Sequence, residues 1–154
     1  MSEILKRTLK MNRTPTAREE VGLNLAVAFS FLKTRFENII EPFGITASQY
    51  NVLRILKGAP EGHPRCEIIV RMIDRAPDIT RLIDRLEKSG LVKRDRTNKD
   101  RRKSITKITD KGLKLVSDIQ PLIDKVHKEF TGKLSEEECK ELSKLAEKLY
   151  EDET

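Results

Sequence analysis

The sequence contains no Trp, only two Cys and two His, and seven Gly among 154 residues. The two cysteines, Cys66 and Cys139, lie far apart in the chain and form no disulfide framework, so we expect reduced thiols. No apolar run approaches the roughly 20 residues that span a bilayer, and the first residues show no apolar signal-peptide segment. These absences predict a cytoplasmic protein with no membrane partner.

The motifs that carry enzyme chemistry are absent as well. The sequence has no Gly-rich phosphate loop after a strand, no nucleophile elbow and no compelling pairing of His with a carboxylate. A zinc site built from His63, Cys66, His127 and Cys139 would lack finger or ribbon spacing and would join distant segments. We therefore predict a protein that is not an enzyme, with no catalytic residue, no metal and no other cofactor.

Charged residues make up 36% of the chain, and the positive excess is concentrated in one segment. The formal net charge is +6, and residues 93–107 alone hold eight Lys or Arg against two acids. The other residues are balanced, with 23 bases and 23 acids. Screening acts over about 8 Å at physiological salt, so an excess focused in this way favours contact with phosphates at that segment. A solvated basic loop is the alternative.

Apolar residues at intervals of three and four predict a long amphipathic helix that ends near Pro42 and Gly44. Its apolar stripe consists of Val21, Leu25, Ala28, Phe29, Leu32, Phe36 and Ile39. The stretch "ITASQY" then matches a capping box, with Thr46 as N-cap and Gln49 as N3. This box predicts a second helix that continues to about Lys57 and buries Tyr50, Leu53 and Leu56.

Two further helices follow the breaker "GAPEGHP". The first is short, with an apolar side formed by Cys66, Ile69, Val70 and Ile73, which predicts a buried and inert Cys66 thiol. The second has Pro77 at its first position and Asp78 in its first turn. Its buried stripe is Ile79, Leu82, Ile83 and Leu86. Gly90 and Leu91 predict that this helix ends in a Schellman motif.

After residue 90 the pattern changes to short runs compatible with β-structure. Residues 91–94 and 104–108 predict a two-stranded hairpin around the polar, basic stretch "DRTNKDRRK". Thr109 can cap a fifth, long amphipathic helix. Ser135 and Glu138 form a second capping box, which begins a sixth helix with Leu142, Leu145 and Leu149 on one side.

Two short helices followed by a basic hairpin have the layout of a winged helix-turn-helix. The second of these helices would lie in the major groove, where short polar side chains near its N-terminus contact base edges. The candidate residues of this recognition helix are Asp78, Thr80, Arg81, Asp84 and Arg85. The hairpin would be the wing, which contacts phosphates or the narrow minor groove of A·T-rich DNA. The candidate wing residues are Arg96, Lys99, Asp100, Arg101, Arg102 and Lys103. The alternative for the recognition-helix candidates is an ordinary solvated surface.

The same residues resemble the MarR (multiple antibiotic resistance regulator) family of transcription factors. The resemblance covers residues 45–112 and rests on "ITASQYNVLRIL", "DITRLIDRLEKSGLV" and "KDRRKSITKITDKG". It implies a homodimer formed by the first, fifth and sixth helices, with the helix around Thr80 in the major groove. It also implies that Arg101 or Arg102 enters the minor groove while Asp100 orients these arginines. Members of the family commonly respond to a small phenolic or anionic ligand bound between the dimer and DNA-binding regions.

We therefore predict a mainly α protein with a small β-hairpin wing. Residues 15–44 and 113–154 would form a helical dimerisation region, and residues 45–112 a winged helix-turn-helix DNA-binding lobe. The predicted function is that of a ligand-responsive homodimeric repressor that binds a pseudo-palindromic operator in double-stranded DNA. The alternatives are a non-specific architectural DNA-binding protein and a winged helix that binds RNA or another protein. The apolar stripes of the long helices could also close on one another within one chain.

Overall fold

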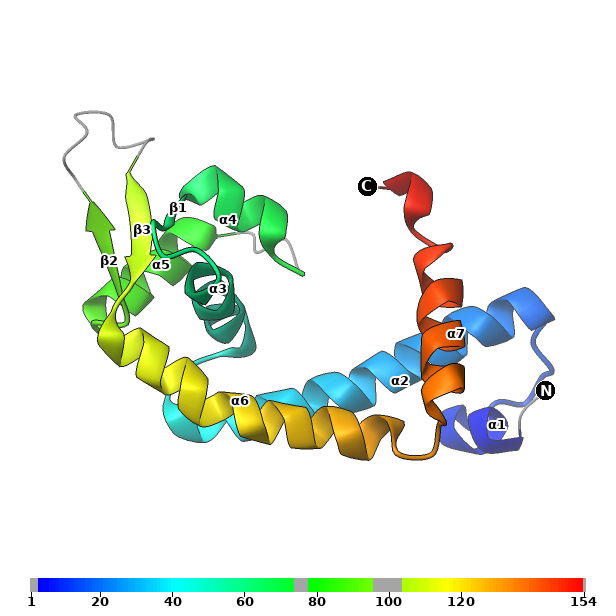
Figure 1. Cartoon of the computed structure of the whole chain (residues 1–154). Helices are drawn as coiled ribbons and strands as arrows, with labels where there is room; N and C mark the ends of the chain where they lie inside the picture. The colour runs from blue at the N-terminus through cyan, green and yellow to red at the C-terminus, as the bar shows by residue number, and fades with distance from the viewer. Residues whose placement is uncertain (1–2, 74–77, 96–103, 154) are drawn as a thin grey trace.

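A computed structural model describes residues 3–73, 78–95 and 104–153 of the chain (Figure 1). In chain order, its elements are α1 (Glu3–Leu9), α2 (Ala17–Ile40), the 3-10 turn η1 (Glu41–Phe43), α3 (Ala47–Lys57), β1 (His63–Pro64), α4 (Arg65–Arg71), α5 (Ile79–Lys88), β2 (Val92–Asp95), β3 (Ile105–Ile108), α6 (Asp110–Thr131), α7 (Glu136–Glu147) and η3 (Glu151–Glu153). The predicted fold class, mainly α with a small β wing, is confirmed. Within the described ranges, no helix is both long enough and apolar enough to cross a membrane.

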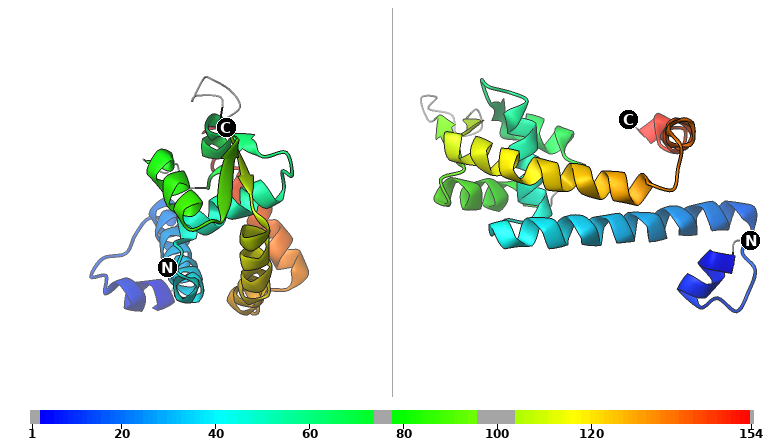
Figure 2. Two further views of the ribbon diagram at one scale, coloured as in Figure 1. Left: turned by 90° about the vertical axis from the view of Figure 1, so that its left-hand side faces the viewer. Right: turned by 60° about the horizontal axis from the view of Figure 1, so that its bottom comes forward.

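Two long helices, α2 and α6, pack against each other and connect the two ends of the molecule (Figures 1 and 2). The helices α3, α4 and α5 gather with the small sheet at one end, next to the start of α6 and the end of α2. At the other end, α7 follows the C-terminus of α6, and α1 precedes the N-terminus of α2. The winged lobe and α7 therefore lie at opposite ends of the pair of long helices.

Side-chain caps fix where the helices begin. The Thr46 hydroxyl accepts a hydrogen bond from the Gln49 backbone N at 3.2 Å, and Gln49 Oε1 accepts one from the Thr46 backbone N at 2.8 Å. The predicted capping box is confirmed by this pair of bonds. Thr109 caps α6 and Ser135 caps α7, as their sequences predict.

The N-terminus of α2 carries a capping box that was not predicted. The Thr16 hydroxyl accepts from the Glu19 backbone N at 3.3 Å, and Glu19 Oε2 accepts from the Thr16 backbone N at 2.8 Å. The two terminal guanidinium nitrogens of Arg13, Nη2 and Nη1, donate to the same carboxylate at 2.8 and 3.1 Å. These hydrogen bonds, first from Arg13 and then from the Thr16 backbone, lower the pKa of Glu19 to about 2. The helix therefore begins at Ala17, before the predicted apolar stripe starts at Val21.

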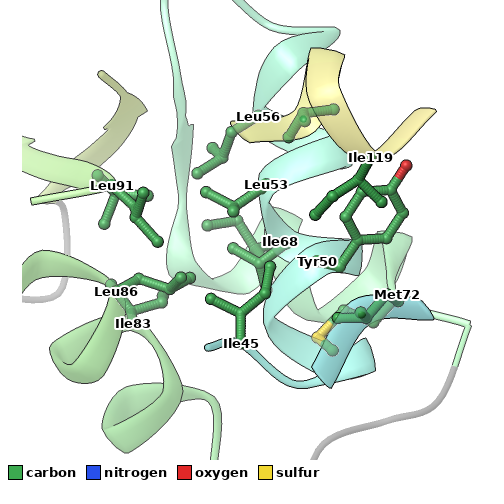
Figure 3. Close-up of a cluster of buried hydrophobic side chains, with 14 of the residues drawn as sticks. Ile45, Tyr50, Leu53, Leu56, Ile68, Met72, Ile83, Leu86, Leu91 and Ile119 are labelled. Atoms are coloured by element: carbon green, nitrogen blue, oxygen red, sulfur yellow. The ribbon is translucent and has the colours of Figure 1, made fainter. Parts of the chain in front are cut away.

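The core lies where α3, α4 and α5 meet the sheet and the first half of α6 (Figure 3). The predicted stripes of α3 and α5 supply six of its buried side chains, and only Leu82 of these stripes is half-buried rather than buried. The buried core residues of the three main helices are Tyr50, Val52, Leu53 and Leu56 of α3, Ile79, Ile83 and Leu86 of α5, and Val116, Ile119 and Ile123 of α6. Each large aliphatic side chain that is fully buried contributes about 1.5–3 kcal/mol. These contacts fix the orientation of α5 on α3 and α6.

The wing strands belong to a three-stranded antiparallel sheet with the order β1, β3, β2. The predicted hairpin is confirmed, with Val92 paired to Ile108. The third strand was not predicted, because its two residues, His63 and Pro64, lie in a segment rich in turn-forming residues. Pro64 is compatible with this strand because β1 is at the edge of the sheet, where a missing N–H breaks no ladder.

The C-terminus of α5 forms the predicted Schellman motif. Gly90 adopts a φ of +71°, and the Leu91 backbone N donates to the Leu86 carbonyl at 3.0 Å. The first turn of α6 packs on this ending: the Thr109 hydroxyl donates to the Gly90 carbonyl at 2.7 Å. Gly112 approaches so closely that an added Cβ would lie 2.3 Å from the Leu91 carbonyl oxygen. The end of α5, the start of the wing and the start of α6 therefore form one tight junction.

The short helix α1 was not predicted. For α4, the structure corrects the prediction. On α4, the proposed apolar side was wrong: Val70 and Ile73 are 80% and 75% exposed, and Cys66 is exposed. The buried residues are Ile68 on the helix and Met72 at its end. A helix of seven residues has no repeating stripe, so its contacts with α3 and α5 determine which side is buried. The expectation of a buried thiol at Cys66 is therefore wrong.

Candidate nucleic-acid interface

The recognition-helix candidate, α5, begins at Ile79, two residues later than predicted. Asp78 is its N-cap: Oδ1 accepts a hydrogen bond from the Arg81 backbone N at 3.1 Å. Pro77, predicted as the first helical residue, lies outside the described residues. The other carboxylate oxygen of Asp78 lies 3.0 Å from Arg81 Nε, and the Arg81 side chain is 81% exposed. Asp78 therefore both caps the helix and orients an exposed guanidinium at its N-terminal end.

Thr80 lies in the exposed first turn of α5 and links this helix to α4. Its hydroxyl accepts a hydrogen bond from Arg65 Nη1 at 2.9 Å. Arg65 is the first residue of α4 and is exposed. It was not among the candidates from the sequence, because its place beside α5 depends on how two helices pack and not on a local motif. The structure therefore adds a cation to the N-terminal end of the recognition helix.

Asp84 lies between α5 and the wing. Its Oδ1 accepts from Arg94 Nη2 at 2.5 Å, and Arg94 Nη1 lies 3.5 Å from Glu87 Oε2. Glu87 also accepts from the Arg94 backbone N at 3.3 Å. The Arg94 side chain is 20% exposed, so these interactions are screened less than those on an open surface. Asp84 and Glu87 therefore hold β2, and with it the base of the wing, against α5.

The remaining candidate on α5, Arg85, is accessible to a large partner together with two neighbouring cations. Arg81, Arg85 and Lys88 are all exposed, and their spacing of four and three residues places them along one side of the helix. The buried stripe of α5 occupies the opposite side. A duplex could therefore approach this row of cations without disturbing the core.

The predicted wing residues lie outside the described part of the chain: Arg96, Lys99, Asp100, Arg101, Arg102 and Lys103. The strands on either side of them are described, and Lys93 on β2 is paired directly opposite Lys107 on β3. Like charges opposite each other disfavour strand pairing. Glu61 offsets part of this repulsion, since its Oε2 lies 3.4 Å from Lys107 Nζ. A polyanion bound at the base of the wing would offset it further.

No group of three or more His, Cys, Asp or Glu side chains is placed to hold a metal ion in the described ranges. His127, considered above for zinc, packs edge-to-face on Phe36 with the ring centroids 5.0 Å apart. This imidazole therefore contributes to the packing of α6 on α2.

The comparison with known proteins covers both the winged lobe and the long helices. The sequence model of the MarR family matches residues 45–104. A MarR transcription factor from Planctomyces limnophilus is 39% identical, with a TM-score of 0.68 and coverage of 88% of this chain and 98% of that chain. This chain belongs to the MarR family. MarR-family proteins are transcription regulators, which confirms the prediction that the chain is not an enzyme.

Two other solved structures share the MarR fold. BpsR of Bordetella bronchiseptica, whose DNA binding is regulated by 6-hydroxynicotinic acid, is 25% identical, with a TM-score of 0.74 and coverage of 88% of this chain and 98% of that chain. MepR of S. aureus, solved in complex with DNA, is 20% identical, with a TM-score of 0.76 and coverage of 90% of this chain and 100% of that chain. Both matches extend well beyond residues 45–104, so the long helices outside the winged lobe are part of the shared fold.

Proposed function

We propose that this MarR-family regulator binds a specific sequence in double-stranded DNA and represses transcription from it. The observation that carries the proposal is the exposed side of α5, where Arg81 and Arg85 are accessible. The helix is held in place by the bonds of Asp84 to Arg94 and of Thr80 to Arg65. A rigid helix with accessible cations and a polar N-terminal turn suits binding in the major groove. Lys93, at the base of the basic wing, would contact phosphates.

We infer that the regulator is a homodimer whose interface involves α2, α6 and α7, as the family resemblance implies, together with α1. In the single chain, these helices and the turn after α7 expose many large apolar side chains: Ile4, Val21, Leu25, Phe29, Leu142, Leu145, Leu149 and Tyr150. Soluble monomers rarely expose large apolar patches. Burying such a patch stabilises the assembly by roughly 25 cal/mol for each Å² of apolar surface removed from water. A second copy of the chain would bury them. Closure within one chain is disfavoured, since Leu142 and Leu145 of α7 and Leu149 just after it are 51–60% exposed here.

In this proposal, α1 joins residues 15–44 and 113–154 in the dimerisation region, and residues 45–112 form the DNA-binding lobe. Twofold symmetry would present two copies of α5 to the same face of the DNA. Half-sites one helical turn apart, at about 34 Å, would match such a pair. The operator would therefore be pseudo-palindromic.

We also propose that a small phenolic or anionic effector binds between these two regions and weakens DNA binding. The support is the relative BpsR, whose DNA binding is regulated by 6-hydroxynicotinic acid. An effector changes DNA affinity only by its preference for one of two conformers, here with α5 helices at different spacings. The conformer that fits DNA would be the one without effector.

The class of partner can be tested by fluorescence anisotropy with labelled duplex DNA and duplex RNA at several salt concentrations. We expect tighter binding of DNA, with a log-log salt slope of about −0.9 for each phosphate neutralised. Arg85→Gln should weaken binding, whereas Lys125→Gln on the far half of α6 should not. Tighter binding of RNA, or no salt-dependent binding of either duplex, would contradict the proposal. Transcription in vitro from a promoter that carries the bound site then distinguishes repression from activation.

A further inference from the structure

Arg65 lies beside the recognition helix, on a neighbouring helix. It is the first residue of α4, and α4 packs against α5 (Figure 1). Its Nη1 donates a hydrogen bond at 2.9 Å to the hydroxyl of Thr80, in the first turn of α5. Both residues are exposed. The guanidinium group of Arg65 is therefore held at the N-terminal end of α5, on the accessible surface.

The hydrogen bond to Thr80 leaves most of this guanidinium group available. A guanidinium group has five N–H donors, of which this bond uses one. The other donors can bind two phosphate oxygens at once, in a fixed planar geometry that an ammonium group lacks. In the described ranges, no carboxylate forms an ion pair with Arg65, whereas Arg81 Nε lies 3.0 Å from Asp78 Oδ2. Arg65 can therefore offer its whole charge to an anion at this end of α5.

Thr80 restricts where this charge lies. An arginine side chain without a partner samples many rotamers, and ordering it on binding lowers the affinity by about twofold to tenfold. The bond to Thr80 orders the side chain before DNA binds, so the loss on binding is smaller. Ile68 of α4 and Ile79 of α5 are both buried in the core, which fixes the two helices that carry Arg65 and Thr80.

We propose that Arg65 binds a phosphate of the DNA backbone and that Thr80 is its positioning residue. In a helix-turn-helix, the helix before the recognition helix crosses the DNA backbone. Arg65 begins that helix, next to the first turn of α5. Phosphate contacts fix the register of a protein on the duplex without reading its sequence. Thr80 therefore strengthens binding through Arg65, and not through a contact of its own with a base.

The test is a double-mutant cycle on Arg65 and Thr80, with binding of duplex DNA measured by fluorescence anisotropy. Arg65→Met should weaken binding about tenfold, the typical effect of one charge-assisted hydrogen bond, and should reduce the log-log salt slope by about 1. Thr80→Val removes the hydroxyl but keeps the shape, and should weaken binding about threefold. In the Arg65→Met background, Thr80→Val should have no further effect, because the hydroxyl then has no guanidinium group to hold.

Conservative variants separate positioning from a general loss of structure. Thr80→Ser keeps the hydroxyl and should bind DNA as the wild type does. Arg65→Lys keeps the charge but not the planar fork, so its affinity should lie between those of the wild type and Arg65→Met. Arg71→Met removes the same charge from the other end of α4, where Arg71 pairs with Glu67 at 3.6 Å, and should leave the affinity unchanged. Thermal unfolding followed by circular dichroism checks that each variant is folded.

The effect of Thr80 on sequence preference distinguishes positioning from a base contact. Positioning predicts that Thr80→Val weakens binding by the same factor for the bound site and for duplexes with single base-pair changes in that site. A base contact predicts that Thr80→Val relaxes the preference at one base pair.

This inference rests on the proposed function, because it requires that α5 binds DNA. It is overturned if Arg65→Met keeps the wild-type affinity and salt slope, or if Thr80→Val has the same effect with and without Arg65. A preference relaxed at a single base pair in Thr80→Val also overturns it. In each of these cases Arg85→Gln still weakens binding, so the proposed function stands. If the wild-type chain binds no duplex DNA, the proposed function fails and the inference fails with it.

Discussion

Replacing Gly112 with Ala should disrupt the junction between α5, the wing and α6. The added Cβ would lie 2.3 Å from the Leu91 carbonyl oxygen and 2.7 Å from Ile108 Cγ1. The Leu91 carbonyl also accepts a hydrogen bond from the Thr109 backbone N at 3.1 Å. The Leu91 carbonyl cannot move away from the new methyl group without weakening that hydrogen bond. The first turn of α6 must therefore move away from the end of α5.

The expected loss of stability follows from three contributions. Overpacking typically costs about 1–3 kcal/mol, and the weakened backbone hydrogen bond costs about 1 kcal/mol more. The better helix propensity of Ala offsets about 1 kcal/mol of this. Gly112→Ala should therefore be about 1–3 kcal/mol less stable, which lowers Tm by about 2–4 °C per kcal/mol for a chain of 154 residues.

The assay is thermal unfolding followed by circular dichroism at one fixed protein concentration. Gly58→Ala is the matched control, since Gly58 has an ordinary φ of −76° and its added Cβ would lie 3.5 Å from the Ile55 carbonyl oxygen. This control should be unchanged or up to about 1 kcal/mol more stable. If Gly112→Ala unfolds at the wild-type temperature or above it, the packing described for this junction is wrong.

Three other variants test separate parts of the account. Arg94→Gln leaves Asp84 without its cation, so we expect a loss of about 1 kcal/mol in stability and weaker DNA binding by anisotropy. A folded Arg94→Gln protein with wild-type DNA affinity would show that this residue does not position the wing. Hydrogen bonds from Arg13 hold the pKa of Glu19 at about 2, below its ordinary 4.5, so this carboxylate stabilises the fold above pH 4.5 and loses that effect as the pH falls toward 2. The melting temperature of Glu19→Gln should therefore lie below that of wild type at pH 7, and the difference should decrease as the pH falls. A difference in melting temperature that does not change with pH would exclude this role. Leu145→Glu on α7 should convert a dimer into monomers in sedimentation experiments, and an unchanged mass would place the interface elsewhere.

Features encoded by neighbouring residues could be predicted from the sequence. The capping boxes at Thr46 and Ser135 and the Schellman ending at Gly90 depend only on residues within one or two turns. The buried stripes of α3 and α5 repeat over enough residues to define one face. For the same reason, the order of the helices and the hairpin was correct.

Features that depend on tertiary contacts could not be predicted. The buried side of α4 is chosen by its neighbours, so Ile68 is buried while Val70 is exposed. The strand β1 exists only because β3, about 40 residues later, pairs with it. The contact of Arg65 with Thr80 and that of Asp84 with Arg94 join separate elements. The sequence pattern therefore gave a set of candidate cations, and the packing shows which side chains orient α5.

The central claim is that a symmetric dimer recognises a specific DNA sequence through α5 and the wing. Its most direct test is selection of the purified protein on a random pool of duplex DNA at about 150 mM salt, near physiological ionic strength. We predict enrichment of a two-fold-related motif whose half-sites are about 10 base pairs apart. Retention of DNA that is sensitive to salt but enriches no motif would contradict the claim and favour non-specific architectural binding.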